Sequence, residues 1–281
     1  MTDLSIKLPE LQLALSVYGD PNAPAVLFLH GLGNSRDTWN EVAAALAQDH
    51  EVWTLDFRGH GHSGFAQQYE IRGYAEDAGA VLQLIGRPTA IVGHSLGGVV
   101  AGMLAQTSTE LVRRVFLSDP PWYLGDSREY ARTAFGTTHP LIAKSHREMT
   151  ARRAPLSDFV EFVSNVPSSL GGTNKNHISY RHLLSHASAL QRMDSKCWAD
   201  LAGGHALAPL DPKVPFQCPA TILQADSRYG AALLDDHAKW LSETNPGACI
   251  RHYEGCGHNP HRTDAFAAQF LADVRQFLQE A

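Results

Sequence analysis

The sequence predicts an α/β fold in which a mostly parallel sheet is covered by helices on both faces. Three observations predict it. Short apolar runs typical of strands buried on both faces recur along the chain, helical patterns separate them, and several runs end in glycine-rich or polar loops. The composition suits a packed core, because 44% of the 281 residues are hydrophobic and 19% are charged.

Seven segments are predicted as strands. Leu11–Tyr18 alternates in hydropathy and is expected to pair antiparallel near the start of the chain. The other six are shorter runs that we expect to lie parallel in the sheet. These runs are Ala25–Leu29, Glu51–Leu55, Thr89–Val92, Val115–Leu117, Thr221–Gln224 and Cys249–Tyr253.

Helical periodicity lies between the strands. The segment Thr38–Ala47 places its apolar residues on one stripe, and Leu233–Thr244 is a second candidate. Near the carboxyl end, Phe266, Phe270, Val274 and Phe277 occupy one face of a third helix. Helices in these places would cover the sheet.

The alternation of strands and helices breaks once, between residues 122 and 210. This stretch has no convincing strand pattern, and we interpret it as a helical cap inserted between two strands. Residues 1–121 and 211–281 then form the core. The helix candidates in the cap are Arg128–Phe135, Leu156–Val163 and Ile178–Met193.

Charge and composition exclude several classes of protein. With 23 Lys and Arg against 29 Asp and Glu, the chain offers no basic surface for nucleic acid or an anionic membrane. No apolar run approaches the roughly 20 residues of a membrane-spanning helix, and the amino terminus does not resemble a secretory signal. The four cysteines are scattered, as in reduced proteins. We therefore expect a soluble cytoplasmic protein.

The sharpest motif is Gly93-His94-Ser95-Leu96-Gly97, which follows a predicted strand and precedes a helical run. This G-x-S-x-G pattern is typical of a turn that exposes a serine nucleophile. Glycine at both ends tolerates strained dihedral angles and close backbone approach, and a helix amino terminus favours a developing negative charge. Ser95 is therefore the candidate nucleophile.

Three further motifs accompany this turn in a fixed order. They are His30-Gly31-Leu32-Gly33, the segment Asp56–Ser63 with its glycines, and Gly255-x-Gly257-His258. Together the four motifs resemble those of the α/β-hydrolase-fold enzymes with a serine nucleophile. The resemblance implies an eight-stranded sheet, a helical cap after the sixth strand, and a triad of nucleophile, acid and histidine in that chain order.

A serine hydroxyl needs a base, and His258 is the choice among 15 histidines. It sits on a glycine-flanked loop after the strand Cys249–Tyr253. His261 is a weaker competitor with a structural role. The resemblance implies that His60 and His62 shape the site without acting in catalysis.

The acid of the triad has two candidates. Asp226 is preferred, because it follows the strand Thr221–Gln224 and leaves room for a helix and a strand before His258. Many relatives carry a glycine and two more residues before this acid, whereas this chain has only Gln224-Ala225. Asp119, after an earlier strand, is the alternative, since some members of the fold place their acid there.

Oxyanion stabilisation requires hydrogen-bond donors, and backbone amides can supply them. Position gives the N–H of Leu96, directly after the nucleophile, and that of Leu32 in the first glycine loop. Gly31 and Gly33 would allow this loop to approach closely.

The predicted function is a serine hydrolase that cleaves a carboxylic ester or related acyl bond of a small molecule through an acyl-enzyme. Alternatives on the same triad are lactone opening, carbon–carbon bond hydrolysis, perhydrolysis and acyl transfer; a ligand receptor on a hydrolase scaffold is another. No metal-binding or dinucleotide motif is present, so no cofactor is expected. The sequence gives no signal for oligomeric state. Aromatic residues of the cap segment are candidates for substrate binding: Trp122, Tyr123, Phe135, Phe159, Phe162 and Trp198.

Overall fold

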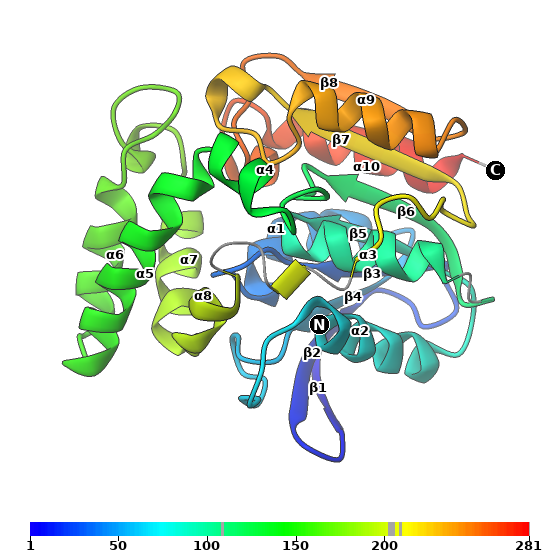
Figure 1. Ribbon diagram of the computed structural model, residues 1–281. Helices are drawn as coiled ribbons and strands as arrows, with labels where there is room; N and C mark the ends of the chain where they lie inside the picture. Colours follow the sequence, from blue (N-terminus) through cyan, green and yellow to red (C-terminus); the bar gives the residue numbers. More distant parts are fainter. Residues whose placement is uncertain (108–109, 202–205, 208–209, 281) are drawn as a thin grey trace.

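The computed structural model describes residues 1–107, 110–201, 206–207 and 210–280. Its centre is an eight-stranded sheet in the order β1-β2-β4-β3-β5-β6-β7-β8 (Figure 1). The strands are β1 (Thr2–Lys7), β2 (Gln12–Tyr18), β3 (Ala25–Leu29), β4 (Glu51–Asp56), β5 (Thr89–His94), β6 (Val112–Ser118), β7 (Ala220–Ala225) and β8 (Cys249–Tyr253).

The sheet is mostly parallel, as the sequence predicts. Strand β2 runs antiparallel to both β1 and β4, and every other pair of neighbours is parallel. Strand β1 was not among the predicted strands. It pairs only with β2 at the sheet edge and is exposed over nearly its whole length, so burial imposes no apolar pattern on it.

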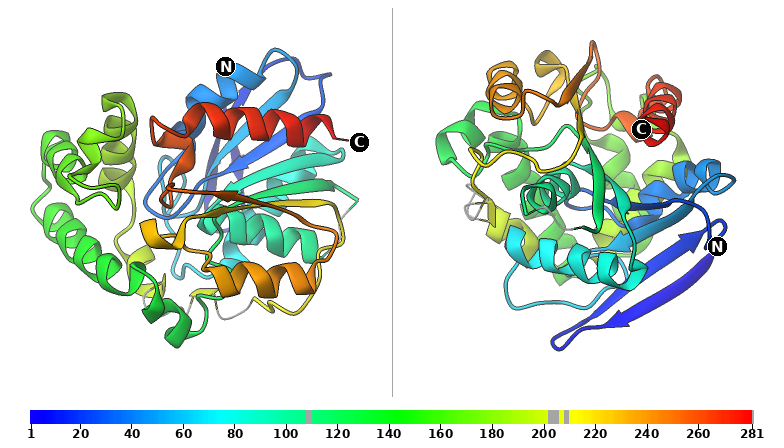
Figure 2. Two further views of the ribbon diagram at one scale, coloured as in Figure 1. Left: turned by 90° about the horizontal axis from the view of Figure 1, so that it is seen from above. Right: turned by 90° about the vertical axis from the view of Figure 1, so that its right-hand side faces the viewer.

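Helices cover both faces of the sheet (Figure 2). One face packs against α1 (Asn40–Leu46) and α10 (Ala267–Gln279), and the other packs against α2 (Ile71–Ile85), α3 (Leu96–Gln106) and α9 (Asp235–Thr244). Successive residues of the central strands alternate between these two cores, as the pleat requires. The α/β fold class is thereby confirmed.

The predicted cap segment, residues 122–210, contains helices and, within its described part, no strand of the sheet. The longer helices α5, α6 and α7 lie side by side at one end of the sheet (Figures 1 and 2). Residues 202–205 and 208–209 of this segment lie outside the described residues. The helices here are α4 (Ser127–Arg132), α5 (Phe135–Ala151), α6 (Leu156–Asn165), α7 (Tyr180–Arg192) and α8 (Lys196–Leu201).

The sequence predicted α6 and α7 closely but missed most of α5. The pattern suggested one helix over Arg128–Phe135, whereas α4 ends at Arg132 and α5 begins at Phe135. Pro140 lies inside α5 and signals a helix end when only the sequence is considered. The division into a core and a cap remains a prediction about domains.

Four 3-10 turns complete the elements. They are η1 (Arg36–Trp39), η2 (Asn174–Asn176), η4 (Ser227–Tyr229) and η5 (Pro260–Arg262). The last of these follows the loop that carries His258, and it brings Arg262 to the same end of the sheet as Ser95.

Candidate active site

Ser95 occupies the tight turn between β5 and α3. Its φ of 54° is a strained value for a residue with a side chain. A Cβ atom added to Gly93 would lie 2.1 Å from the carbonyl oxygen of Gly97, and one added to Gly97 would lie 2.2 Å from that of Leu29. Only glycine fits at both positions, for the reason that the motif suggested.

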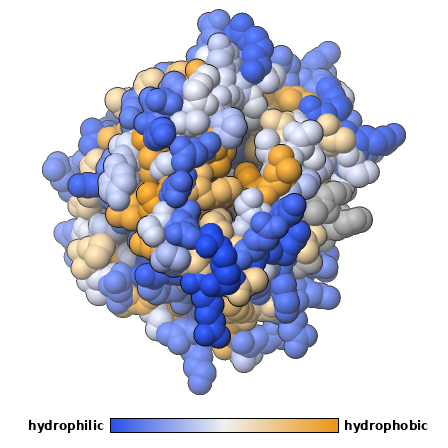
Figure 3. All heavy atoms as spheres, turned by 90° about the vertical axis from the view of Figure 1, so that its left-hand side faces the viewer, coloured by the Kyte–Doolittle hydropathy of each residue, from blue (hydrophilic) through white to orange (hydrophobic). Residues whose placement is uncertain are grey.

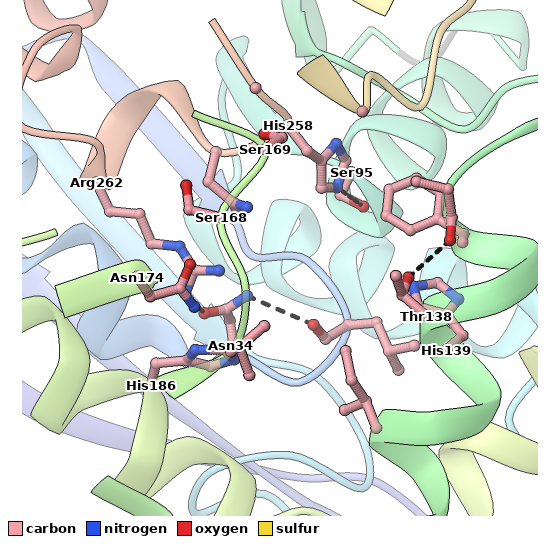
Figure 4. Close-up of a pocket in the computed structure, with 18 of the residues that line it drawn as sticks. Asn34, Ser95, Thr138, His139, Ser168, Ser169, Asn174, His186, His258 and Arg262 are labelled. Carbon is pink, nitrogen blue, oxygen red and sulfur yellow. Dashed lines mark hydrogen bonds between the residues drawn. The ribbon is translucent and has the colours of Figure 1, made fainter. Parts of the chain in front are cut away.

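His258 lies between Ser95 and a buried carboxylate. Its Nε2 atom is 2.9 Å from Ser95 Oγ, and its Nδ1 atom is 2.7 Å from Oδ2 of Asp119. An ionised carboxylate only accepts hydrogen bonds, so Nδ1–H donates to Asp119 and Nε2 is left to accept the Ser95 hydroxyl proton. The orientation of His258 toward Ser95 is visible in Figure 4.

Asp119 directly follows β6, the strand beside the one that carries Ser95. Its side chain is fully buried and accepts hydrogen bonds from the N–H groups of Ala225, Ala232 and Leu233, besides that of His258. These donors compensate for the water that the carboxylate has lost. The φ of 45° at Asp119 points to a backbone held in place for this contact.

Asp226, the preferred acid, does not contact His258. Its carboxylate accepts hydrogen bonds from the side chain and the N–H of Arg228 and from the N–H of Gly255, and Arg228 holds the pKa of Asp226 below its usual range. The preference for Asp226 over Asp119 is therefore wrong as to which carboxylate meets the histidine. Asp226 instead fixes the loop that leads to His258.

The two amides considered for the oxyanion belong to residues that line the same cavity as Ser95. Among the described residues, the N–H groups of Leu32 and Leu96 have no hydrogen-bond acceptor. The Leu32 loop is supported by the buried His60, whose Nε2 atom accepts the N–H of Gly33 at 3.4 Å. Burial lowers the pKa of His60 to about 3, so its ring is neutral.

A mainly apolar cavity of about 280 Å³ opens beside Ser95. Figure 3 shows the hollow on the face formed by the helices of the cap segment, with hydrophobic side chains gathered around it. Three of the predicted aromatic residues line it, namely Phe135, Phe162 and Trp198. The ring of Phe135 meets that of His258 edge-on, with the centroids 4.9 Å apart.

Trp122 and Tyr123, the other named candidates for substrate binding, do not line the cavity. Trp122 is buried against Phe216, and Tyr123 packs against His237 and Trp240. Both side chains leave the chain just beyond Pro121 but point into the packing between helices. The sequence-based assignment of these two residues is therefore wrong, whereas that of Phe135, Phe162 and Trp198 agrees with the cavity.

Comparison with known proteins decides the family. A model of the Alpha/beta hydrolase family matches residues 26–270. The chain belongs to this family. Rv2715 of Mycobacterium tuberculosis, an uncharacterized protein, is 40% identical to this hydrolase over 270 residues, covering 92% of this chain and 76% of its own. Family membership supports hydrolysis as the class of reaction.

Solved structures agree with the fold. A hydrolase from Pseudomonas aeruginosa has a TM-score of 0.75 at 17% identity and covers 99% of this chain and 98% of its own. The enol-lactonase from Burkholderia xenovorans has a TM-score of 0.69 at 20% identity, covering 99% and 100%. At such identities the likeness concerns the fold.

Several polar residues of the cavity were not predicted from the sequence. Arg262, Asn34 and His186 line one side, and Thr138 and His139 line another (Figure 4). Each is separated in the chain from the motifs or belongs to the cap segment, where no motif exists. The only usable signal was the position of Arg262, shortly after His258 in the hydrolase sequence.

Within the described residues, no group of three or more His, Cys, Asp and Glu side chains is placed to hold a metal ion. The helices of this part of the hydrolase are also too short or too polar to cross a membrane.

Proposed function

We propose that this protein is a serine hydrolase that cleaves a carboxylic ester of a small molecule through an acyl-enzyme. The observation that carries the proposal is the row of hydrogen bonds from Ser95 through His258 to Asp119. A serine, a histidine and a buried carboxylate in this order are what nucleophilic acyl chemistry needs.

In the first half of the reaction, Ser95 Oγ attacks the ester carbonyl while His258 Nε2 takes the hydroxyl proton. The negative charge that develops on the carbonyl oxygen would be stabilised by the N–H groups of Leu96 and Leu32. Asp119 stabilises the positive charge that His258 then carries. His258 returns the proton to the departing alkoxide, which leaves as an alcohol, and the acyl group stays on Ser95.

The second half mirrors the first. Water enters beside His258, which takes one of its protons as the oxygen attacks the acyl carbonyl. The tetrahedral intermediate collapses, the carboxylic acid leaves, and His258 gives the proton back to Ser95 Oγ. The enzyme is regenerated without a cofactor.

The helices of residues 122–210 are proposed to act as the cap that selects the substrate. Support comes from the cavity, since α5, α6 and α7 contribute much of its apolar wall opposite the strand ends. Side chains such as Phe162 and Trp198 would contact the acyl or alcohol group. An acyl bond in an apolar, water-poor site also strengthens the electrostatic contacts at Ser95.

Labelling with a fluorophosphonate tests the proposal. We expect a single adduct that maps to Ser95, loss of the adduct in the Ser95→Ala variant, and a fall in p-nitrophenyl ester turnover of about 10³-fold or more in that variant. An adduct on another residue would contradict the proposal, as would a folded wild-type protein that neither labels nor turns over any ester. Binding of a ligand and a protein partner that is unaffected by Ser95→Ala would favour the receptor instead.

A further inference from the structure

Arg262 is a buried cation in the wall of the catalytic cavity. Its side chain is 7% exposed, and Nη1 donates its hydrogen bond, at 3.0 Å, to Oδ1 of Asn34. Nε is buried and has no partner. Among the described residues, no carboxylate lies within ion-pair distance of this guanidinium. Arg262 lines the same cavity as Ser95 and His258 (Figure 4).

The acidic side chains near this end of the molecule have other partners. Asp264 accepts the N–H of Ser179 at 3.2 Å, and Glu41 lies 3.4 Å from His182. The carboxylates of Asp119 and Asp226 are satisfied as described above. The charge of Arg262 is therefore not balanced by any of these groups.

An arginine so placed stays charged. Burial lowers its pKa to about 10, which leaves the guanidinium protonated at neutral pH. A buried charge without a counterion is costly, and proteins rarely keep one unless a ligand supplies the partner. The planar donors of arginine suit a carboxylate, which can accept two parallel hydrogen bonds.

The surroundings of Arg262 complete a polar pocket within the apolar cavity. Asn34, Asn174, His186 and Ser168 lie around it on one side of the cavity (Figure 4). Burial and the neighbouring guanidinium lower the pKa of His186 well below its usual value, so its ring is neutral. Arg262 is thus the cation of this group, which matches a ligand with a single negative charge.

We propose that Arg262 binds a carboxylate of the substrate, so that the enzyme acts on esters that carry a second, anionic group. This inference rests on the proposed ester hydrolysis and names its substrate class. A carboxylate is preferred to a phosphate monoester, because one guanidinium neutralises a single charge and the rest of the cavity is mainly apolar. A dianion would retain an unbalanced charge there.

Asn34 connects this subsite with the reacting centre. Its Oδ1 accepts from Arg262, and its Nδ2 donates to the carbonyl oxygen of Leu32 at 3.4 Å. Leu32 is the residue whose N–H is proposed to bind the oxyanion. A carboxylate bound at Arg262 would therefore hold the substrate against the loop that stabilises its transition state, so Arg262 should affect kcat/KM rather than KM alone.

Two pairs of esters test the proposal. Mono-p-nitrophenyl glutarate and its methyl ester differ in one charge on the acyl side, and 4-acetoxybenzoate and its methyl ester differ in one charge on the alcohol side. We expect kcat/KM to favour the acid over the neutral partner by about 10-fold or more in at least one pair. This preference should disappear in Arg262→Met and be partly retained in Arg262→Lys. Equal kcat/KM values for acid and neutral partner in both pairs would overturn the proposal.

Binding without turnover gives an independent readout. We expect Ser95→Ala to bind glutarate in calorimetry, with the affinity falling by about 100-fold when Arg262→Met is added. Arg275→Met, which changes an exposed arginine of α10, is the matched control and should retain binding. If Arg262→Met fails to fold, Arg262→Lys and the wild-type preference between acid and neutral esters decide the question.

The outcomes separate the two proposals. A protein that is labelled at Ser95 and hydrolyses neutral esters, but neither prefers acids nor binds glutarate, refutes the Arg262 subsite alone. A protein that binds glutarate through Arg262 but is not labelled at Ser95 and cleaves no ester refutes the hydrolase mechanism and keeps the anion site.

Discussion

Nδ1 of His258 lies 2.7 Å from Oδ2 of Asp119, a residue 139 positions earlier in the chain. The carboxylate comes from the end of β6, which pairs directly with the strand that carries Ser95, rather than from β7 one strand further out. The segment after β7 contributes backbone donors to Asp119 instead of an acid. This arrangement makes Asp119 the proposed orienting acid.

Asp119→Asn should lower kcat by about 10³- to 10⁴-fold, because an amide no longer holds His258 in the required tautomer or stabilises its charge. Asp226→Asn should retain most of kcat, since that residue contacts Arg228 and Gly255. Steady-state kinetics of both variants, with circular dichroism to verify folding, make the comparison. A larger loss of kcat in Asp226→Asn than in Asp119→Asn would reassign the acid.

The turn at Ser95 predicts a sharp contrast between two glycines. Gly97→Ala should destabilise the protein by about 2 kcal/mol or more, because the added Cβ would lie 2.2 Å from the carbonyl oxygen of Leu29. Gly79 lies within α2 and has nothing within 4 Å of an added Cβ, so Gly79→Ala should stabilise by about 0.5–1 kcal/mol. Urea unfolding measures both changes. Equal stability of the two variants would contradict the packing described for the turn.

Buried histidines predict how stability depends on pH. Burial lowers the pKa of His30 to about 4 and that of His60 to about 3, against 6.5 for an exposed histidine. Below pH 6.5 the unfolded chain takes up protons that the folded protein does not, so the free energy of unfolding should fall as the pH drops from 7 to 5. Each such histidine contributes up to about 1.4 kcal/mol per pH unit.

Urea unfolding at several pH values between 5 and 7 provides the test for these histidines. The variant His60→Gln should show a shallower dependence on pH, and His252→Gln, at an exposed position, should match the wild type. A free energy of unfolding that stays constant from pH 7 to 5 would refute the prediction.

The cavity predicts which aromatic residue selects the substrate. Phe162→Ala should shift the preference among p-nitrophenyl esters toward longer acyl chains, because the ring lines the cavity and its removal leaves room. Tyr123→Ala should leave the ratio of kcat/KM between long and short esters unchanged, since Tyr123 packs on His237 and Trp240. A shift in Tyr123→Ala but not in Phe162→Ala would show that the substrate lies elsewhere.

Much of the fold could be predicted because burial on both faces leaves a strong pattern. Strands such as β3 and β5 are apolar along their length, and α10 repeats its large residues on one face. The turn at Ser95 was also predictable, since its glycines are required by local backbone contacts. The weakly buried β1 and the proline-containing α5 leave no comparable signal.

The parts of the site that escaped prediction depend on tertiary contacts. Asp119 and Asp226 both follow a parallel strand, and only the arrangement of the loop after β7 decides which one meets His258. Trp122 and Phe162 are both aromatic residues between β6 and β7, but one faces a helix and the other the cavity. The exposure of Arg262 to the cavity depends on η5, a short turn with no periodic pattern.

Synthesis of the chain has a consequence for Asp119. The amide groups that solvate its carboxylate belong to residues 225–233, and its imidazole partner emerges later still. While the ribosome is still adding those residues, this carboxylate must remain in water, and the edge formed by β6 must wait for β7 and β8. Reactivity is thus withheld from every nascent chain until nearly its whole length has been translated, which protects cellular esters from half-made enzyme.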